Sequence, residues 1–98
     1  MGRATRLDHA IMGRMIEWPD WWSWELELSS HLLKRMIDRR FNEADLRLMM
    51  EAAVGYHDDH VRDRWAIETL HAGRKWEVIV EPLPAENVLL VITAYPID

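Results

Sequence analysis

Apolar and polar residues alternate over residues 24–28, in the stretch WELEL. Trp24, Leu26 and Leu28 fall on one side of this stretch, and two glutamates fall on the other. A period of two residues is typical of a short strand that has one face in water. The pattern therefore predicts a strand at this point of the chain.

The apolar period lengthens to that of a helix in the next two segments. Ser29 and Ser30 offer an N-cap to a helix of about ten residues, HLLKRMIDRR. A second helix begins in the stretch FNEAD, where Asn42 is the predicted N-cap and Asp45 completes a capping-box arrangement. Gly55 is predicted to be the C-terminal stop of this second helix.

The period returns to two in the stretches RWAIETLH, KWEVIVE and VLLVITAY, which predict three strands. An Ala-Gly pair at 72–73 joins the first two strands, and its glycine suits the positive φ of a two-residue hairpin turn. The predicted register sets Ile67 opposite Val78 on an apolar face, and Glu68 opposite Glu77 on the other face. The polar stretch YHDDHVRD before these strands is predicted to be a connection.

This order of elements predicts one α+β domain over residues 24–98. It has a short N-terminal strand, two helices, and then an antiparallel three-stranded meander, with the helices packed on one face of the sheet. The last strand is apolar on both faces, so we expect it to be central or covered on both sides.

The preceding leader, residues 1–23, has a weak helical pattern up to residue 17, which Pro19 ends. It also brings most of the aromatic stretch WPDWWSW, residues 18–24. This stretch is too aromatic for a solvated linker. Two alternatives stay open, a hydrophobic lid on the domain's own core and a surface that binds another chain.

Length and composition limit the class of protein. The chain has 98 residues with 49% hydrophobic content, which suits a single core. It has no cysteine, which excludes a disulfide framework, a thiolate nucleophile and a zinc–cysteine site. The longest apolar run, residues 88–94, is far shorter than a membrane span, and the N-terminus lacks the pattern of a signal peptide. We expect a cytoplasmic protein with no membrane partner.

The net charge of −5 argues against a general nucleic-acid coat protein, which would be basic. It does not exclude an RNA-cleaving site, because a local basic patch can bind RNA. Charge alone therefore leaves both an RNA enzyme and a protein-binding module open.

Two groups of residues suggest phosphate chemistry. His31, Arg35 and Arg39 follow one another at intervals of four, so they lie along one ridge of the first helix. An imidazole can move a proton, and guanidinium groups stabilise charge on phosphoryl oxygens. Thr93 and Tyr95 share one face of the last strand, where their hydroxyls could bind a phosphate. The alternatives are an ordinary solvated helix face and a strand end that merely packs.

Two further groups have alternative explanations. Glu68 and Glu77 are predicted to be opposed carboxylates, which either mark a tuned acid or are solvated and neutralised by basic neighbours. His57 and His60 flank two aspartates, and the four side chains could bind zinc or form a solvated turn.

The segments SSHLLKRMIDRRFNEADLRLMM, WEVIVEP and VITAYPID resemble a family of small bacterial proteins of unassigned function that is related to the RelE/BrnT-like toxins. More broadly, they resemble the barnase–EndoU–colicin–RelE fold of metal-independent ribonucleases. The resemblance covers about residues 24–98. Arg40 stands where the family usually has glycine, so we expect the turn between the helices to differ.

The resemblance implies a site between the first helix and the sheet. Its helix motif falls on His31, Arg35 and Arg39, and its terminal motif falls on Thr93 and Tyr95. The implied function is a toxin-like endoribonuclease in which the 2′-hydroxyl of RNA attacks phosphorus and leaves a 2′,3′-cyclic phosphate, with no metal or other cofactor. The partners are then RNA and an antitoxin or other protein.

In this mechanism His31 is the general base or acid. Arg35, supported by Arg39, binds the phosphate. Tyr95 is the second proton-transfer group or a hydrogen-bond donor, and Thr93 positions the phosphate. The alternative function is a non-catalytic interaction module of the same fold, which self-associates as a homodimer or binds a partner through the Trp-rich segment.

Overall fold

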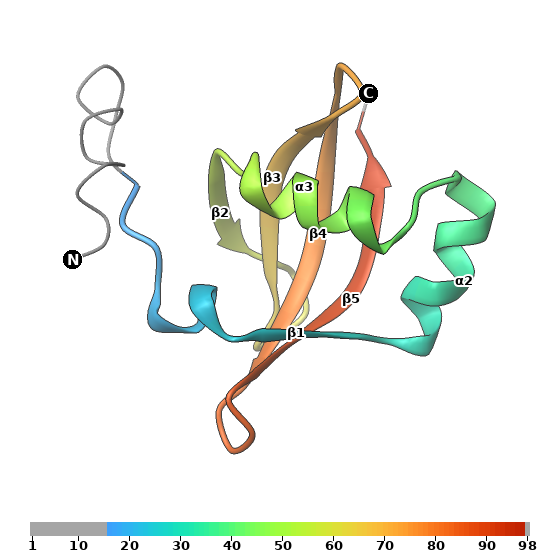
Figure 1. Ribbon diagram of the computed structural model, residues 1–98. Helices are drawn as coiled ribbons and strands as arrows, with labels where there is room; N and C mark the ends of the chain where they lie inside the picture. Colours follow the sequence, from blue (N-terminus) through green and yellow to red (C-terminus); the bar gives the residue numbers. More distant parts are fainter. Residues whose placement is uncertain (1–15, 98) are drawn as a thin grey trace.

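The computed structural model describes residues 16–97 of the chain (Figure 1). The elements are, in order, η1 (Asp20–Ser23), β1 (Glu25–Leu28), α2 (Ser30–Arg39), α3 (Glu43–Glu51), β2 (Gly55–Asp58), β3 (Trp65–His71), β4 (Arg74–Leu83) and β5 (Val88–Pro96). The predicted helical pattern up to residue 17 falls almost entirely outside the described residues.

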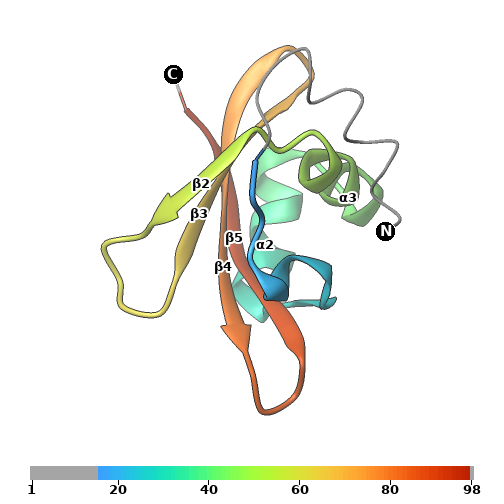
Figure 2. The same ribbon diagram turned by 90° about the vertical axis from the view of Figure 1, so that its left-hand side faces the viewer.

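The strands form one mixed sheet in the order β1-β5-β4-β3-β2. Strand β1 runs parallel to β5, and every other pair is antiparallel. Both helices lie on the same face of this sheet, which leaves the opposite face without a helix (Figure 2). The general α+β class is therefore confirmed.

The predicted sheet needs correction, because it has five strands rather than a three-stranded meander with a separate short strand. The stretch predicted as a polar connection contains the edge strand β2, which pairs with β3. Gly55 does not stop the second helix, because α3 ends at Glu51 and Gly55 is the first residue of β2. The error arose because two of the four β2 residues, His57 and Asp58, are exposed and polar, so the strand has no apolar pattern.

The predicted helix starts are confirmed. The Ser29 hydroxyl accepts a hydrogen bond from the Leu32 amide, 3.0 Å away, and so caps α2. Asn42 and Asp45 form the predicted reciprocal capping box at the start of α3. Arg40 ends α2 in the left-handed conformation, with φ 56° and ψ 54°, although this conformation costs any residue other than glycine some free energy.

The core lies between the helices and the sheet. The predicted hairpin register is confirmed, with Ile67 opposite Val78 and Glu68 opposite Glu77. Leu32 and Met49 come from the two helices and are fully buried against the inner face of the sheet. Ile67, Val78, Val80, Leu89 and Val91 line that inner face. The last strand is central as predicted, since β5 lies between β1 and β4.

The Trp-rich segment packs on the domain's own core, as the lid alternative predicts. Trp21, Trp22 and Trp24 pack against the core cluster. Trp18 stacks on Trp22 at 4.0 Å between ring centroids, and on Tyr56 at 5.3 Å. Half-buried aromatic rings thus cover the end of the core nearest β2 and β3.

Side chains at the two ends of helix α2 bond backbone carbonyls in the half of β5 that does not pair with β1. Strand β1 pairs with β5 only as far as Val91. Beyond that point the Ser29 hydroxyl donates to the carbonyl oxygen of Ile92 (2.9 Å), and the Arg39 guanidinium donates to that of Ala94 (2.9 Å). These two bonds replace ladder bonds, and they fix α2 along the edge of the strand that ends in Tyr95. Within residues 16–97 no helix is long and apolar enough to span a membrane.

Candidate functional site

The three predicted residues of α2 lie at its surface or along the edge of β5. His31 is exposed in the first turn and has no hydrogen bond or ion pair within residues 16–97. Arg35 forms an ion pair with Asp38 at 2.8 Å, in which Arg35 is half-buried and Asp38 is exposed. Arg39 is half-buried and bonds the carbonyl of Ala94. The predicted ridge exists, but Arg35 and Arg39 already have partners in the structure.

Thr93 and Tyr95 share one strand face, as predicted, and it is the face away from the helices. Thr93 pairs with Ile79 and Tyr95 with Glu77, whereas the core residue Val91 pairs with Val80. The register shifts between these pairs, so Ile92 is an extra residue on β5. This bulge turns Thr93 and Tyr95 to the outer face, although plain alternation would place them with Val91.

The Tyr95 hydroxyl donates a hydrogen bond to Oε1 of Glu77 at 2.7 Å. On the same face, His57 Nδ1 lies 2.8 Å from Oε2 of Glu68, and His57 Nε2 lies 3.7 Å from Oε2 of Glu77. We call these four side chains, Tyr95, Glu77, Glu68 and His57, the polar row. They come from the four adjacent strands β5, β4, β3 and β2.

The outer face is partly covered although no helix lies on it (Figure 2). Ala66 is only 1% exposed and Ile79 only 5%, and both alternate with residues of the inner face. The Thr93 hydroxyl is buried and has no hydrogen-bond partner. Neighbouring side chains of this face therefore keep Ala66, Ile79 and the Thr93 hydroxyl out of solvent.

The pKa of Tyr95 is raised to about 12, chiefly by burial and next by the hydrogen bond to Glu77. The negative charges of Glu77 and Asp59 contribute to this raised pKa, and the positive charge of Arg39 partly offsets it. The phenol therefore stays protonated at neutral pH, where it can donate a hydrogen bond or a proton.

The structure brings some of the predicted residues together and keeps others apart. Tyr95 and Arg39 are close enough for the guanidinium charge to act on the phenol. No hydrogen bond or ion pair within the described residues connects His31 or Arg35 to Thr93 or Tyr95. His57 was not expected at this site, because the sequence pattern predicted a polar connection where β2 lies. The alternation in GYHD, with Tyr56 inward and His57 outward, is the signal that could have found it.

The zinc alternative at His57 and His60 was tested by the geometry of their side chains. His57 faces the two glutamates of the polar row, whereas the His60 side chain is 90% exposed and contacts Asp59. Within residues 16–97 no three His, Cys, Asp or Glu side chains gather so that they could hold a metal ion.

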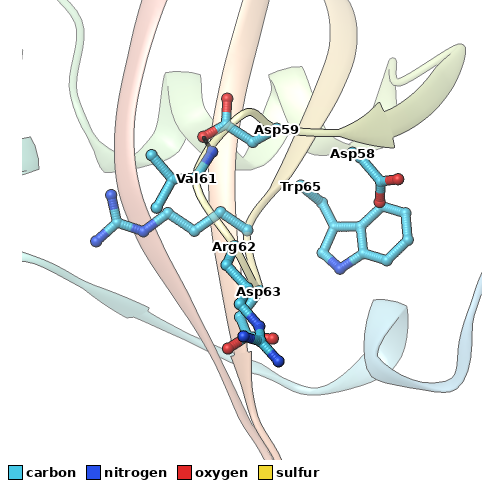
Figure 3. A pocket seen from close by; sticks show the side chains of 7 residues that line it. Asp58, Asp59, Val61, Arg62, Asp63 and Trp65 are labelled. Atoms are coloured by element: carbon cyan, nitrogen blue, oxygen red, sulfur yellow. Dashed lines mark hydrogen bonds between the residues drawn. The ribbon is translucent and has the colours of Figure 1, made fainter.

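Two hollows of the surface lie away from the five predicted site residues. The first is in the β2–β3 connection, and Figure 3 shows the Arg62 and Trp65 side chains extending to opposite sides of it. Its lining residues are Asp58, Asp59, Val61, Arg62, Asp63, Arg64 and Trp65. The second lies beside the Trp-rich segment and is lined by Trp22, Trp24, Leu26, Arg47, Met50 and Glu51.

Comparisons of the chain with protein-family models, with curated proteins and with solved structures give no significant match.

Proposed function

We propose that this protein is a metal-independent endoribonuclease that acts on RNA at the outer face of its sheet. The observation that supports the proposal is the pair formed by Tyr95 and Glu77, with the charge of Arg39 beside it. The resemblance of residues 24–98 to RelE/BrnT-like toxins supports the same reaction class. An antitoxin or another protein partner belongs to this proposal as well.

The reaction needs one group that accepts a proton and one that donates a proton. The 2′-oxygen attacks the adjacent phosphorus and loses its proton to a base, while the P–O5′ bond breaks and the leaving oxygen gains a proton. Tyr95 is the donor in this proposal, because its pKa of about 12 keeps it protonated while it remains more acidic than an alcohol. The products are a 2′,3′-cyclic phosphate and a 5′-hydroxyl.

Arg39 supplies the positive charge. Its Nη1 donates to the Ala94 carbonyl, and a guanidinium has five N–H donors, so in this proposal the others bind phosphate oxygens. Such donors stabilise the charge that develops on the phosphoryl group. Arg35 and Thr93 as phosphate ligands, and His31 as the proton-transfer group, stay predictions of the sequence.

The interaction-module alternative rested on the acidic net charge of −5, which is unchanged, and on an exposed Trp-rich segment. Trp21, Trp22 and Trp24 pack against the protein's own core, so that observation no longer favours the alternative. Self-association through this segment stays testable by mass measurement of wild type and of Trp21→Ser and Trp22→Ser.

The proposal is tested by RNA cleavage in the presence of a chelator, with detection of the cyclic phosphate end. A substrate with 2′-deoxyribose at the cleaved position should stay intact, because it lacks the nucleophile. Tyr95→Phe should lower kcat by about 10²-fold or more, since it removes the proton donor. Tyr56→Phe is the matched control, because its hydroxyl bonds the Glu17 carbonyl and lies outside the polar row.

An intact RNA substrate after incubation with clean wild-type protein contradicts the proposal. So does a Tyr95→Phe variant that cuts as well as Tyr56→Phe.

A further inference from the structure

We propose that His57 is the general base of this site and that Glu68 positions its imidazole. The inference rests on the proposed ribonuclease function. His57 is not part of the helix motif or the terminal motif on which the resemblance to the toxins is based. It starts from strand β2, whose pairing with β3 puts His57 beside the carboxylates of the neighbouring strands.

The contact with Glu68 sets the tautomer of His57. An ionised carboxylate only accepts hydrogen bonds, so the proton shared over the 2.8 Å contact belongs to Nδ1 of the imidazole. In the neutral ring the lone pair is then on Nε2, which lies 3.7 Å from Glu77 Oε2, beyond hydrogen-bond distance. An imidazole held this way by a carboxylate is arranged to accept a proton at Nε2. Its side chain is 49% exposed, so a substrate hydroxyl can reach it.

Glu77 lies between the proposed base and the proposed acid. Its Oε1 accepts from the Tyr95 hydroxyl and its Oε2 faces His57 Nε2. The two proton-transfer groups thus contact different oxygens of one carboxylate. In-line displacement at phosphorus needs a proton acceptor and a proton donor on opposite sides of the phosphorus atom, and in this proposal His57 and Tyr95 take these two roles.

The protons balance in this scheme. The 2′-OH proton moves to His57 Nε2 as the O2′–P bond forms, and the Tyr95 proton moves to O5′ as the P–O5′ bond breaks. The imidazolium then lies beside the carboxylates of Glu68 and Glu77. Return of its proton to Tyr95 restores the enzyme, and Glu77 contacts both groups.

The other described histidines lack this environment. His31 has no partner, His71 packs edge-on against Trp76, and His60 is 90% exposed in the loop. His60 does contact one carboxylate, that of Asp59, but no second carboxylate faces its other nitrogen. His60 therefore provides a matched control three residues away from His57.

The test compares His57→Gln with His60→Gln in the RNA cleavage assay, using full-length protein. We expect His57→Gln to lower kcat by about 10²-fold or more with little change in KM, and His60→Gln to behave as wild type. Thermal melts show whether each variant is folded. Glu68→Gln should also lower kcat without changing KM, and Glu68→Asp should restore part of the loss.

A second readout needs no RNA. Nitrogen-15 NMR of the imidazole should show the proton of neutral His57 on Nδ1 in wild type, and a mixture of tautomers in Glu68→Gln. A merely structural role of Glu68 would leave the tautomer of His57 unchanged.

The outcomes separate the two proposals. Wild-type protein that does not cut RNA overturns both. If Tyr95→Phe is impaired while His57→Gln cuts normally, only the assignment of His57 fails. If His31→Ala stops cleavage and His57→Gln does not, the imidazole of the site is His31.

Discussion

Two threonines on opposite faces of the sheet test how a buried hydroxyl changes the free energy of unfolding, with and without a hydrogen-bond partner. Thr69 is 2% exposed on the inner face, and its hydroxyl donates to the carbonyl of Met49 near the end of α3. The Thr93 hydroxyl is buried on the outer face without a partner. Replacement of each by valine keeps the shape and the β-branch and removes only the hydroxyl.

The two substitutions should change stability in opposite directions. Thr69→Val removes a hydrogen bond and leaves a buried carbonyl with one partner fewer, so it should destabilise the fold by about 1–2 kcal/mol. Thr93→Val removes a polar group that is desolvated without compensation, so it should stabilise the fold by about 1 kcal/mol. The difference of about 2–3 kcal/mol between the variants corresponds to more than about 8 °C in Tm for a domain of this size.

Urea unfolding followed by tryptophan fluorescence measures both variants, and equal m-values would show that the unfolded states are comparable. A Thr93→Val variant that loses as much stability as Thr69→Val would refute the reasoning. It would mean that the Thr93 hydroxyl has a favourable partner, such as an ordered water molecule.

Two further predictions concern the end of α2 and the phenol of the polar row. Arg40→Gly should stabilise the fold by about 0.5–1 kcal/mol in the same urea assay, because glycine adopts φ 56° without a Cβ penalty; a destabilised variant would contradict this. The raised pKa of Tyr95 predicts a stability contribution that is fully present below about pH 10, the ordinary value, and is lost as pH rises toward 12. The unfolding free energy of wild type relative to Tyr95→Phe should therefore be constant up to about pH 10 and decline above it; a decline that begins near neutral pH would contradict the assignment.

Local sequence signals were sufficient for much of the fold. The serine and asparagine caps fixed both helix starts, because a capping side chain bonds amides only two or three residues away. The Ala-Gly pair at 72–73 and the one-sided apolar pattern fixed the register between β3 and β4. A slip of one residue would have moved the apolar side chains to the wrong face.

Edge strand β2 could not be predicted from these local sequence patterns. Tyr56 is the β2 residue that packs on the core, so the strand has no repeating apolar pattern. The strand is held to the sheet by its backbone pairing with β3. Because β2 was missed, His57 was considered only as a zinc ligand in a loop, and its two glutamate neighbours could not be paired with it.

The sequence by itself thus determined the helices, the hairpin and the fact that Thr93 and Tyr95 share a face. Only the tertiary structure decided which face that is. Val91 is buried in the core, and plain alternation would have placed Tyr95 there too. The extra residue Ile92 reverses the alternation, while α2 fills the edge of β5 that β1 leaves open. The bulge is visible only in the pairing of β4 with β5, whose register shifts between Ile79 and Val80. This pairing places the tyrosine beside Glu77.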